Sequence, residues 1–280
     1  MKPAPLDYAA HWPLRLWFYA VCLFLYAPLL VLVAFSFNDS RRTVVWEGFT
    51  TEWYGVAFHD QSLIQAFANS LTIAGLATVI SLLLGAAAAV ALWRFRFPLK
   101  APFEGALALP IVVPEICMGV SMLVFFARVM PWPIGLPWPL NLGAITIAHV
   151  SFCFPFVAVV VRARLASFNR EWEEAARDLG ADEWRIFWDI LVPHMGPGLL
   201  AGALLAFTLS LDDFVITYFT SGPNTITFPV KVYAMVRFSV TPEVNAASTV
   251  LIVLTIALTA IALRLQGGGN LAREVVGSRP

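Results

Sequence analysis

The sequence predicts an all-α, polytopic membrane protein with six transmembrane helices. Of its 280 residues, 59% are hydrophobic and only 13% are charged, which is too apolar for the surface of an ordinary soluble domain. A helix needs about 20 apolar residues to cross the hydrocarbon core of a bilayer. Six stretches meet this requirement, and they cover residues 16–37, 66–93, 104–127, 142–161, 197–219 and 245–263. An even number of spans places both termini on the same side of the membrane.

The individual spans differ in how clearly the sequence marks them. The first apolar stretch runs from residue 16 to residue 38 without a charge and is longer than the core of a signal peptide, so we expect it to remain in the mature protein. The second and fourth spans are the clearest, because residues 61–93 and 129–161 contain no charged side chain. The third span is interrupted by Glu115, and the fifth by Asp212-Asp213.

Basic residues are distributed unequally between the two sides, which predicts the orientation of the chain. With the amino terminus in the cytoplasm, thirteen basic residues fall on inner segments and five on outer ones. The inner residues are Lys2, Arg15, Arg94, Arg96, Lys100, Arg162, Arg164, Arg170, Arg177, Arg185, Arg264, Arg273 and Arg279, and the outer ones are Arg41, Arg42, Arg128, Lys231 and Arg237. We therefore expect both termini and the 162–195 loop to be cytoplasmic.

Two short helices are expected within the 162–195 loop. Asn169 is a good N-cap for the first helix, whose first turn is acidic, and Gly180 is a natural C-terminal stop. The second helix is expected to start after Asp182 and to end at Val192-Pro193. Two capped helices hinged at a glycine suggest a docking element, although an amphipathic loop lying on the bilayer has the same pattern.

The same loop carries a spaced motif. Glu174-Ala175-Ala176 is followed after three residues by Gly180 and after nine more by Ile190-Leu191-Val192-Pro193. This pattern resembles the E-A-A…G…I-x-L-P signature of binding-protein-dependent ABC importer permeases, with Val192 in place of the usual leucine. In that family the loop sits in a groove of the cytoplasmic ATPase subunit. The resemblance implies an ATPase-coupling role for six residues, which are Glu174, Ala175, Ala176, Gly180, Ile190 and Pro193.

A wider resemblance covers nearly the whole chain and narrows the family. The matching pieces are Tyr26-Ala27-Pro28, Phe35-Ser36-Phe37-Asn38, Trp53-Tyr54, Asn69-Ser70-Leu71, Pro114-Glu115, Ser210-Leu211-Asp212-Asp213-Phe214-Val215-Ile216 and Pro242-Glu243-Val244-Asn245-Ala246. Together they resemble the putrescine/spermidine importer permeases. This resemblance implies a type I ABC importer permease fold in a transmembrane domain over residues 66–264, an N-terminal span and outer loop over 1–65, and a short cytoplasmic tail over 265–280.

The resemblance also implies an assembly in the inner membrane. Its expected partners are a second, homologous permease subunit, two cytoplasmic ATPase subunits that bind ATP and Mg, an extracytoplasmic substrate-binding protein and membrane lipid, with no nucleic acid. This chain lacks a G-x-x-x-x-G-K-[ST] phosphate loop, because its Gly267–Gly269 run is not followed by a lysine. We therefore expect no catalytic residue, metal or cofactor on this chain, and ATP hydrolysis on a separate subunit.

Three intramembrane acids are candidates for a substrate pathway. A carboxylate in the hydrocarbon core costs several kcal/mol unless it faces a partner or a wet cavity. With a rise of about 1.5 Å per residue, Glu115 lies about 18 Å into the third span and Asp212 about 22 Å into the fifth. Carboxylates at similar depth suit a vestibule for a di- or tri-ammonium substrate. Asp212 and Asp213 would point about 100° apart on a helix, so we expect one to face the path and the other to be structural.

Prolines also mark the third span, and the acids have another interpretation. Pro110 and Pro114 loosen the helix just before Glu115, and carbonyls freed there could accept hydrogen bonds from ammonium groups. Alternatively, the acids pair with basic or polar groups of a partner subunit, or sit at a helix break near the outer surface.

Several functional alternatives stay open at this point. Another small solute, such as an amino-phosphonate, an opine or an amino-acid-like molecule, fits the same permease architecture. An ATP-independent transporter or channel fits the hydropathy but leaves the Glu174 to Pro193 motif unexplained. A membrane enzyme is disfavoured, since neither a DDxxD nor an HExxH motif is present. The choice between putrescine and spermidine, the subunit that holds the main substrate contacts, and the outer loops that meet the binding protein are also left open.

Overall fold

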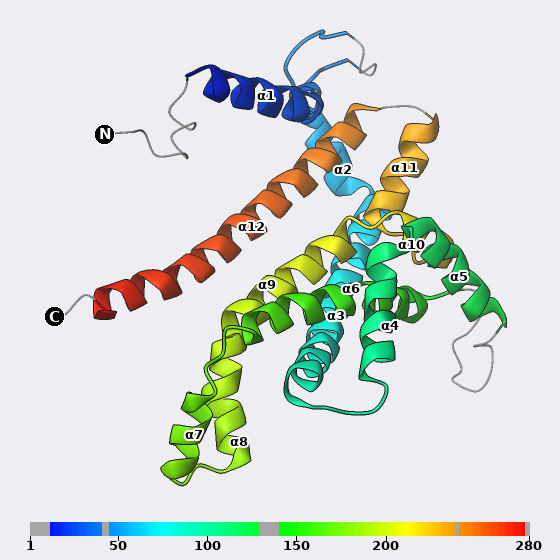
Figure 1. The fold of residues 1–280 in the computed structure, drawn as a ribbon. Coiled ribbons are helices and arrows are strands. Elements are labelled where there is room, and N and C mark those ends of the chain that lie inside the picture. The colour runs from blue at the N-terminus through cyan, green and yellow to red at the C-terminus, as the bar shows by residue number, and fades with distance from the viewer. Residues whose placement is uncertain (1–11, 41–44, 129–139, 239–240, 278–280) are drawn as a thin grey trace. The chain divides into compact units, whose positions relative to one another are not determined.

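The computed structural model describes residues 12–40, 45–128, 140–238 and 241–277 and is built from helices (Figure 1). The helices are α1 (Trp12–Phe35), α2 (Glu52–His59), α3 (Gln61–Arg94), α4 (Lys100–Val112), α5 (Glu115–Arg128), α6 (Leu142–Leu165), α7 (Glu171–Asp178), α8 (Glu183–Arg185), the π-helical η2 (Ile186–Leu191), α9 (Val192–Leu211), α10 (Val215–Thr220), α11 (Phe228–Phe238) and α12 (Pro242–Gly277). In the described residues, strand-like pairing is limited to one isolated bridge between Asn38 and Phe49. The predicted all-α class is confirmed.

The helices correspond roughly to the six expected spans. Among the described residues, α1, α3, α6 and the continuous run Glu183–Leu211 are each long and apolar enough to cross a membrane. Helices α4 and α5 pass the same test as a pair bent by 110°, and the sixth expected span lies in α12, where Pro242–Ala257 is a shorter apolar helix. The chain is therefore a multi-pass membrane protein.

The chain divides into two compact units. One unit holds residues 1–61 and 234–254, and the other holds residues 62–233 and 255–280. The three segments expected from the sequence, 1–65, 66–264 and 265–280, differ from these two units. Those expected boundaries stay a prediction.

In the smaller unit, the segment after α1 is held against the start of α2 by polar contacts. The Trp53 indole nitrogen donates to the Asn38 carbonyl oxygen at 2.8 Å, and the hydroxyls of Ser36 and Tyr54 lie 2.7 Å apart. The side chain of Asn38 is buried, and its amide nitrogen donates to the Val45 carbonyl oxygen. Two sequence pieces that resembled the importer permeases, residues 35–38 and Trp53-Tyr54, thus meet in space.

In the larger unit, α6 is the central helix of the core. Its side chains are buried around much of its circumference, including Ile145, Cys153, Val157 and Val161. Small residues on the neighbouring helices let the backbones approach closely: a Cβ added to Gly85 of α3 would lie 2.7 Å from the Val157 Cβ. Such close approach is typical of helix packing in membranes, where small residues line the interface.

We predict that Gly85→Val destabilises this packing. The new side chain would collide with Val157 and with the Phe154 carbonyl oxygen, so α3 and α6 must separate. Overpacking of this kind costs about 1–3 kcal/mol. Gly75→Val on the same helix is the matched control, because a Cβ there meets nothing within 4 Å. Thermal unfolding in detergent should give a lower midpoint for Gly85→Val than for Gly75→Val, and equal midpoints would contradict the packing argument.

Candidate functional site

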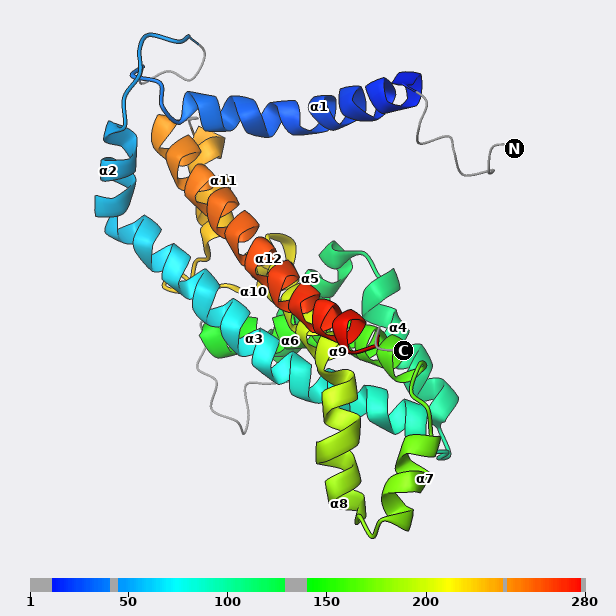
Figure 2. The ribbon, with the colours of Figure 1, turned by 90° about the vertical axis from the view of Figure 1, so that its left-hand side faces the viewer.

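The 162–195 loop forms a helical hairpin between α6 and α9, made of α7, the turn after it, α8 and η2. Figures 1 and 2 both show this hairpin extending from one end of α6 and α9, away from α10. The first helix starts at Glu171, whose backbone N–H donates to Asn169 Oδ1 at 3.0 Å. The expected N-cap is therefore displaced by one residue, because Arg170 occupies the capping position and makes no side-chain cap bond.

The turn between α7 and α8 depends on Gly180. Its φ is +84°, a left-handed conformation that side chains disfavour. The N–H groups of Gly180 and Ala181 donate to the carbonyl oxygens of Arg177 and Ala176, both at 2.9 Å, which closes the last turn of α7. The next helix is capped by Asp182, whose Oδ1 accepts from the Arg185 N–H at 2.8 Å. The expected helix stop at Gly180 and the expected helix start after Asp182 both match the structure.

The expected end of the second helix at Val192-Pro193 is wrong. The chain stays helical from Glu183 to Leu211, passing through η2 directly into α9. A proline inside an α-helix presses on the carbonyl four residues earlier. Here the turn before Pro193 is widened, since the Val192 N–H donates to the Phe187 carbonyl five residues back. This π turn makes room for the proline ring, so the helix continues.

The six motif residues mostly face outward on the hairpin. Glu174, Ala175, Gly180 and Pro193 are exposed, whereas Ala176 and Ile190 are half-buried. Large apolar side chains that the sequence analysis did not single out share this exposure: Leu179 is 89% exposed and Trp184 is 70% exposed. Exposed apolar side chains of this kind are typical of a surface that meets another protein or a membrane.

An ion-pair network joins the hairpin to the end of α3. The Arg94 guanidinium donates to Glu173 Oε1 at 2.9 Å and to Glu183 Oε2 at 2.8 Å. Arg177 completes the network, with its Nη2 2.9 Å from Glu183 Oε1 and 3.5 Å from Glu173 Oε2. The hydrogen bonds and negative charge of Glu183 raise the pKa of the Arg177 guanidinium. The sequence analysis did not predict this network, in which Arg94 and Glu173 are 79 residues apart.

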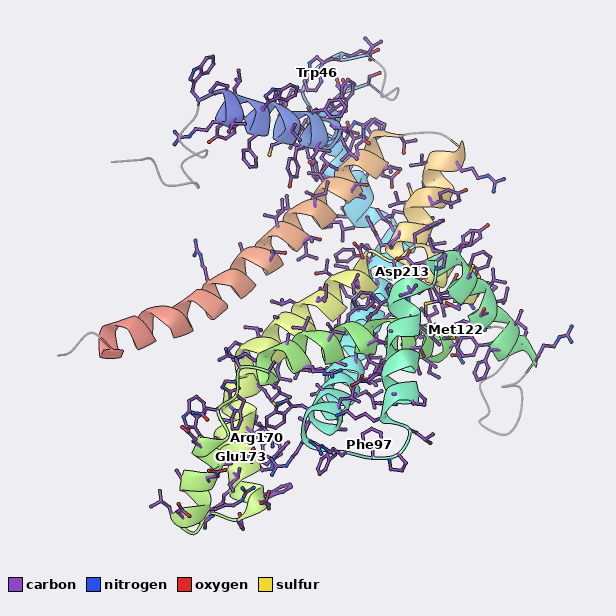
Figure 3. The ribbon with its side chains drawn as sticks, in the orientation of Figure 1. Trp46, Phe97, Met122, Arg170, Glu173 and Asp213 are labelled. Atoms are coloured by element: carbon purple, nitrogen blue, oxygen red, sulfur yellow. The ribbon has the colours of Figure 1, made fainter. Side chains whose placement is uncertain are left out.

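Aromatic contacts reinforce the same junction. Phe168 lies between Trp93 of α3 and Trp172 of α7, with ring centroids 5.5 Å and 5.6 Å away in edge-to-face arrangements. The Arg170 guanidinium lies 5.5 Å from the centroid of the Trp93 ring, a cation–π distance. Figure 3 shows Arg170 and Glu173 close together at this junction, and Asp213 far from them at the other end of α9.

The candidate pathway acids lie at two helix breaks. Helix α4 ends at Val112 and α5 begins with Glu115, and the chain bends by 110° between them at the position that Pro114 predicted. The expected continuous fifth span is also broken, since α9 ends at Leu211 and α10 begins at Val215. Backbone groups freed at breaks of this kind are tolerated at membrane depth where protein or a wet cavity satisfies them.

Asp213 satisfies several of these groups at the second break. Its Oδ2 accepts hydrogen bonds from the Thr217 N–H at 2.8 Å and the Thr217 hydroxyl at 2.9 Å. The same oxygen lies 3.3 Å from His149 Nε2 of α6, and His149 Nδ1 lies 2.7 Å from the Ser210 hydroxyl. All four side chains are buried. Asp213 is therefore engaged inside the chain, where it caps α10.

Asp212 and Glu115, in contrast, are exposed. Helix α10 packs on α5 so closely that a Cβ on Gly119 would lie 2.8 Å from the Phe219 ring. This packing places the break before Glu115 close to the break that carries Asp212. Within the described part of the chain, neither acid has an ion-pair partner. Each break thus exposes one acidic side chain, and two acids at neighbouring breaks suit a cation.

Three aromatic rings cluster at the break that carries Asp212 and on the helices that follow it. The Phe214 ring centroid is 4.8 Å from that of Tyr233 and 5.5 Å from that of Tyr218, and both tyrosines are nearly half exposed. Partly exposed aromatic rings attract ammonium groups by cation–π interaction.

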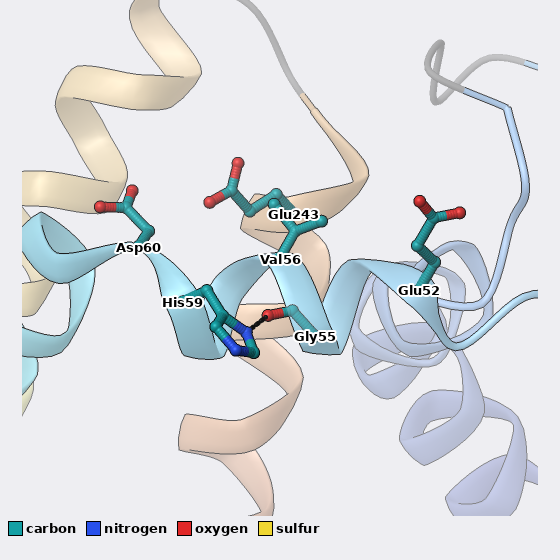
Figure 4. A pocket seen from close by; sticks show the side chains of 6 residues that line it. All are labelled: Glu52, Gly55, Val56, His59, Asp60 and Glu243. Carbon is teal, nitrogen blue, oxygen red and sulfur yellow. Dashed lines mark hydrogen bonds between the residues drawn. The ribbon is translucent and has the colours of Figure 1, made fainter.

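A second group of acids lines a surface hollow in the smaller unit (Figure 4). The hollow has a volume of about 700 Å³ and is lined by Glu52, Gly55, Val56, His59, Asp60 and Glu243. The His59 side chain folds back on α2, with Nδ1 2.7 Å from the Gly55 carbonyl oxygen. None of the pathway residues expected from the sequence lies in this hollow.

Comparison with known proteins connects these features to one family. Residues 81–268 match the model of the family described as "Binding-protein-dependent transport system inner membrane component". The chain is 45% identical over 232 residues to the putrescine transport system permease protein PotI of Escherichia coli strain K12. This alignment covers 82% of each chain. It is 41% identical over 239 residues to the spermidine/putrescine transport system permease protein PotC of the same strain. This second alignment covers 85% of this chain and 88% of PotC.

Solved structures agree on the fold. A bacterial ABC transporter involved in the import of the acidic polysaccharide alginate superposes with a TM-score of 0.66 at 20% identity, over 94% of this chain and 96% of the other. The methionine ABC transporter MetNI, in an inward-facing conformation, superposes with a TM-score of 0.60 over 74% of this chain and 95% of the other. The chain belongs to the family of binding-protein-dependent transport system inner membrane components.

Proposed function

We propose that this chain is a permease subunit of an ATP-driven ABC importer that moves putrescine or spermidine across the inner membrane. The main support for a polyamine substrate is the sequence identity of 45% to PotI and 41% to PotC, over more than four fifths of the chain. The exposed Glu115 and Asp212 support it, since two carboxylates at neighbouring breaks favour a substrate with two or more ammonium groups.

The proposed assembly contains a second permease subunit, two ATPase subunits and an extracytoplasmic binding protein. ATP and Mg bind to the ATPase subunits, and both termini of this chain lie in the cytoplasm with the hairpin. The basic residues of the inner segments support this orientation. Family membership supports the need for a binding protein, because the family description itself names it.

In this assembly the hairpin receives the movement of the ATPase. Leu179 and Trp184 present apolar surface to a groove, while exposed Glu174 offers a negative charge to a base of the ATPase. Closure of the ATPase pair on ATP would shift the hairpin and open the path outward, where the binding protein releases its ligand. Hydrolysis would then restore the inward-facing state. This chain contributes a conformational change, and no covalent step takes place on its residues.

A different solute is the second candidate. The chain is also 32% identical over 209 residues to the molybdenum transport system permease protein ModB of Escherichia coli strain K12. An anionic solute would meet the repulsion of Glu115 and Asp212, so the acids favour the cationic class.

The proposal predicts that Glu174→Ala uncouples ATP hydrolysis from import. In proteoliposomes containing the whole complex, polyamine-loaded binding protein should stimulate ATP hydrolysis by the wild type, and this stimulation should fall about 10-fold in the variant, which corresponds to about 1.4 kcal/mol of lost interaction. Gly180→Pro should have at least the same effect, because proline cannot adopt a φ of +84°. The readouts are ATP turnover and uptake of labelled putrescine.

Asp178→Ala is the matched control, since Asp178 is an exposed acid on the same helix and outside the motif. It should behave as the wild type. Stimulation by a different loaded solute, with none by polyamines, would retain the architecture and reject the substrate class. Full stimulation of Glu174→Ala in assembled complexes would reject the role of the hairpin.

A further inference from the structure

The ion pairs of Arg94 with Glu173 and Glu183 join α3 to the hairpin, although α3 is not adjacent to the hairpin in sequence. The hairpin is covalently continuous with α6 and α9, whereas the end of α3 is 77 residues away in sequence from the start of α7 and reaches the hairpin through side chains. One guanidinium at the last residue of α3 contacts both arms of the hairpin, Glu173 on α7 and Glu183 on α8. A planar guanidinium has donors in a fixed fork, so it holds two carboxylates in a defined geometry.

The burial of Glu173 makes this contact costly to open. Glu173 is only 6% exposed, although it lies in a helix whose other residues are exposed or half-buried. A buried carboxylate that loses its basic partner is left charged in a poorly hydrated place. Arg177 also faces Glu173, but at 3.5 Å, compared with 2.9 Å for Arg94. Separation of α3 from the hairpin would therefore remove the nearer of the two basic partners.

The opposite part of α3 is bonded to the segment that follows α10. The Asn69 side-chain amide donates to the Ile226 carbonyl oxygen at 3.0 Å, and the Phe228 N–H donates to the Ser70 hydroxyl at 2.9 Å. Asn69 and Ser70 are buried. From Asn69 to Arg94 the helix spans about 38 Å at about 1.5 Å per residue. Helix α3 thus connects the hairpin to the α10–α11 segment, which follows the break that carries Asp212.

We propose that Arg94 is a positioning residue that fastens the hairpin to α3, so that the two move as one body and α3 carries the movement to the α10–α11 segment. The proposal rests on the importer function proposed above. A hairpin released from α3 would still dock on the ATPase through its exposed residues, but its movement would no longer be delivered through α3.

The test is the ratio of labelled putrescine taken up to ATP hydrolysed, measured in proteoliposomes with loaded binding protein. Arg94→Gln should lower this ratio about 10-fold while ATP turnover stays within about twofold of the wild type. Arg94→Lys should give an intermediate ratio, since one ammonium cannot reproduce the two-armed geometry. Arg96→Gln is the matched control: Arg96 is exposed two residues away, and it has no ion pair within the described chain.

A second variant guards against a failure of Arg94→Gln to assemble. Glu183→Gln removes one arm of the network at an exposed side chain and should also lower the ratio, with Asp178→Asn as its control. A wild-type ratio in either Arg94→Gln or Glu183→Gln would overturn the proposal. If the wild-type complex itself shows no polyamine uptake, the proposed function fails instead, so the two failures are distinguishable.

Chemical cross-linking gives an independent test. Cys22, Cys117 and Cys153 are first replaced, and Arg94→Cys is combined with Glu183→Cys. A bis-methanethiosulfonate linker about as long as the lost ion pair, which forms a reducible disulfide with each cysteine, should restore the uptake-to-ATP ratio, and reduction should lower it again. If the hairpin and α3 must instead move past each other, the linker will leave uptake low or reduce it further, which would contradict motion as one body.

Discussion

Asp213→Ala is expected to lower the free energy of unfolding by about 2–5 kcal/mol, because each buried donor left without an acceptor costs about 1–3 kcal/mol. The substitution removes an acceptor for the Thr217 N–H and hydroxyl and leaves His149 without its acidic neighbour. These groups are buried, so water cannot readily replace the lost contacts. For a chain of this size, the thermal midpoint should fall on the order of 10 °C. Thermal unfolding of the purified protein in detergent measures this midpoint.

The neighbouring Asp212→Ala is the control for this prediction. Asp212 is exposed and forms no ion pair in the described part of the chain, so its removal should change the midpoint by a few degrees at most. Asp213→Asn should lie between the two, because an amide keeps one acceptor oxygen but loses the charge. Equal midpoints for Asp212→Ala and Asp213→Ala would show that the buried contacts around His149 do not stabilise the break.

Much of the fold was predictable from local signals in the sequence. The apolar stretches have the length of a membrane span, and the stop at Gly180 and the cap at Asp182 depend on residues within one turn. Pro114 similarly marks the bend before Glu115. These features follow from backbone and side-chain properties that act over a few residues, so no knowledge of distant parts of the chain is needed.

The features that the sequence did not reveal depend on distant or competing contacts. Pro193 is a strong helix stop by itself, but the preceding π turn removes its clash and lets the helix continue. The break after Leu211 contains no proline or glycine, and its stabilising partner His149 comes from another helix. The Arg94 network likewise joins segments 79 residues apart. Such contacts arise from tertiary packing, which local patterns do not encode.

Tertiary contacts also distinguish Asp212 from Asp213, two adjacent acids that look equivalent in the sequence. On a continuous helix, Asp212 and Asp213 would differ by rotation alone. The break changes this, because Asp213 turns back to cap α10 and Asp212 stays exposed. We therefore propose Glu115 and Asp212 for a direct role in the pathway and Asp213 for a structural role, and the pathway role of these acids stays a prediction.

Neutralising both exposed acids is expected to have the largest effect on transport. A hydrogen bond to a charged group contributes about 1.5–3 kcal/mol, so Glu115→Gln or Asp212→Asn alone should lower the putrescine uptake rate about 10- to 100-fold. The double variant should lower it about 100-fold or more. Gln and Asn keep the shape of the side chains, so the change tests the charges. Uptake of labelled putrescine at limiting loaded binding protein is the measurement.

Two further measurements separate a defect in the pathway from a defect in assembly. Binding-protein-stimulated ATP hydrolysis should persist in the double variant, because the acids lie at the opposite end of α9 from the hairpin, as Asp213 and Glu173 show in Figure 3. Glu47→Gln removes one exposed acid from the loop between α1 and α2 and should leave uptake unchanged.

Because charge attraction is screened by salt, the wild-type rate should also fall as ionic strength rises, more steeply than that of the double variant. Wild-type uptake by a correctly assembled double variant would show that the two acids do not contact the substrate.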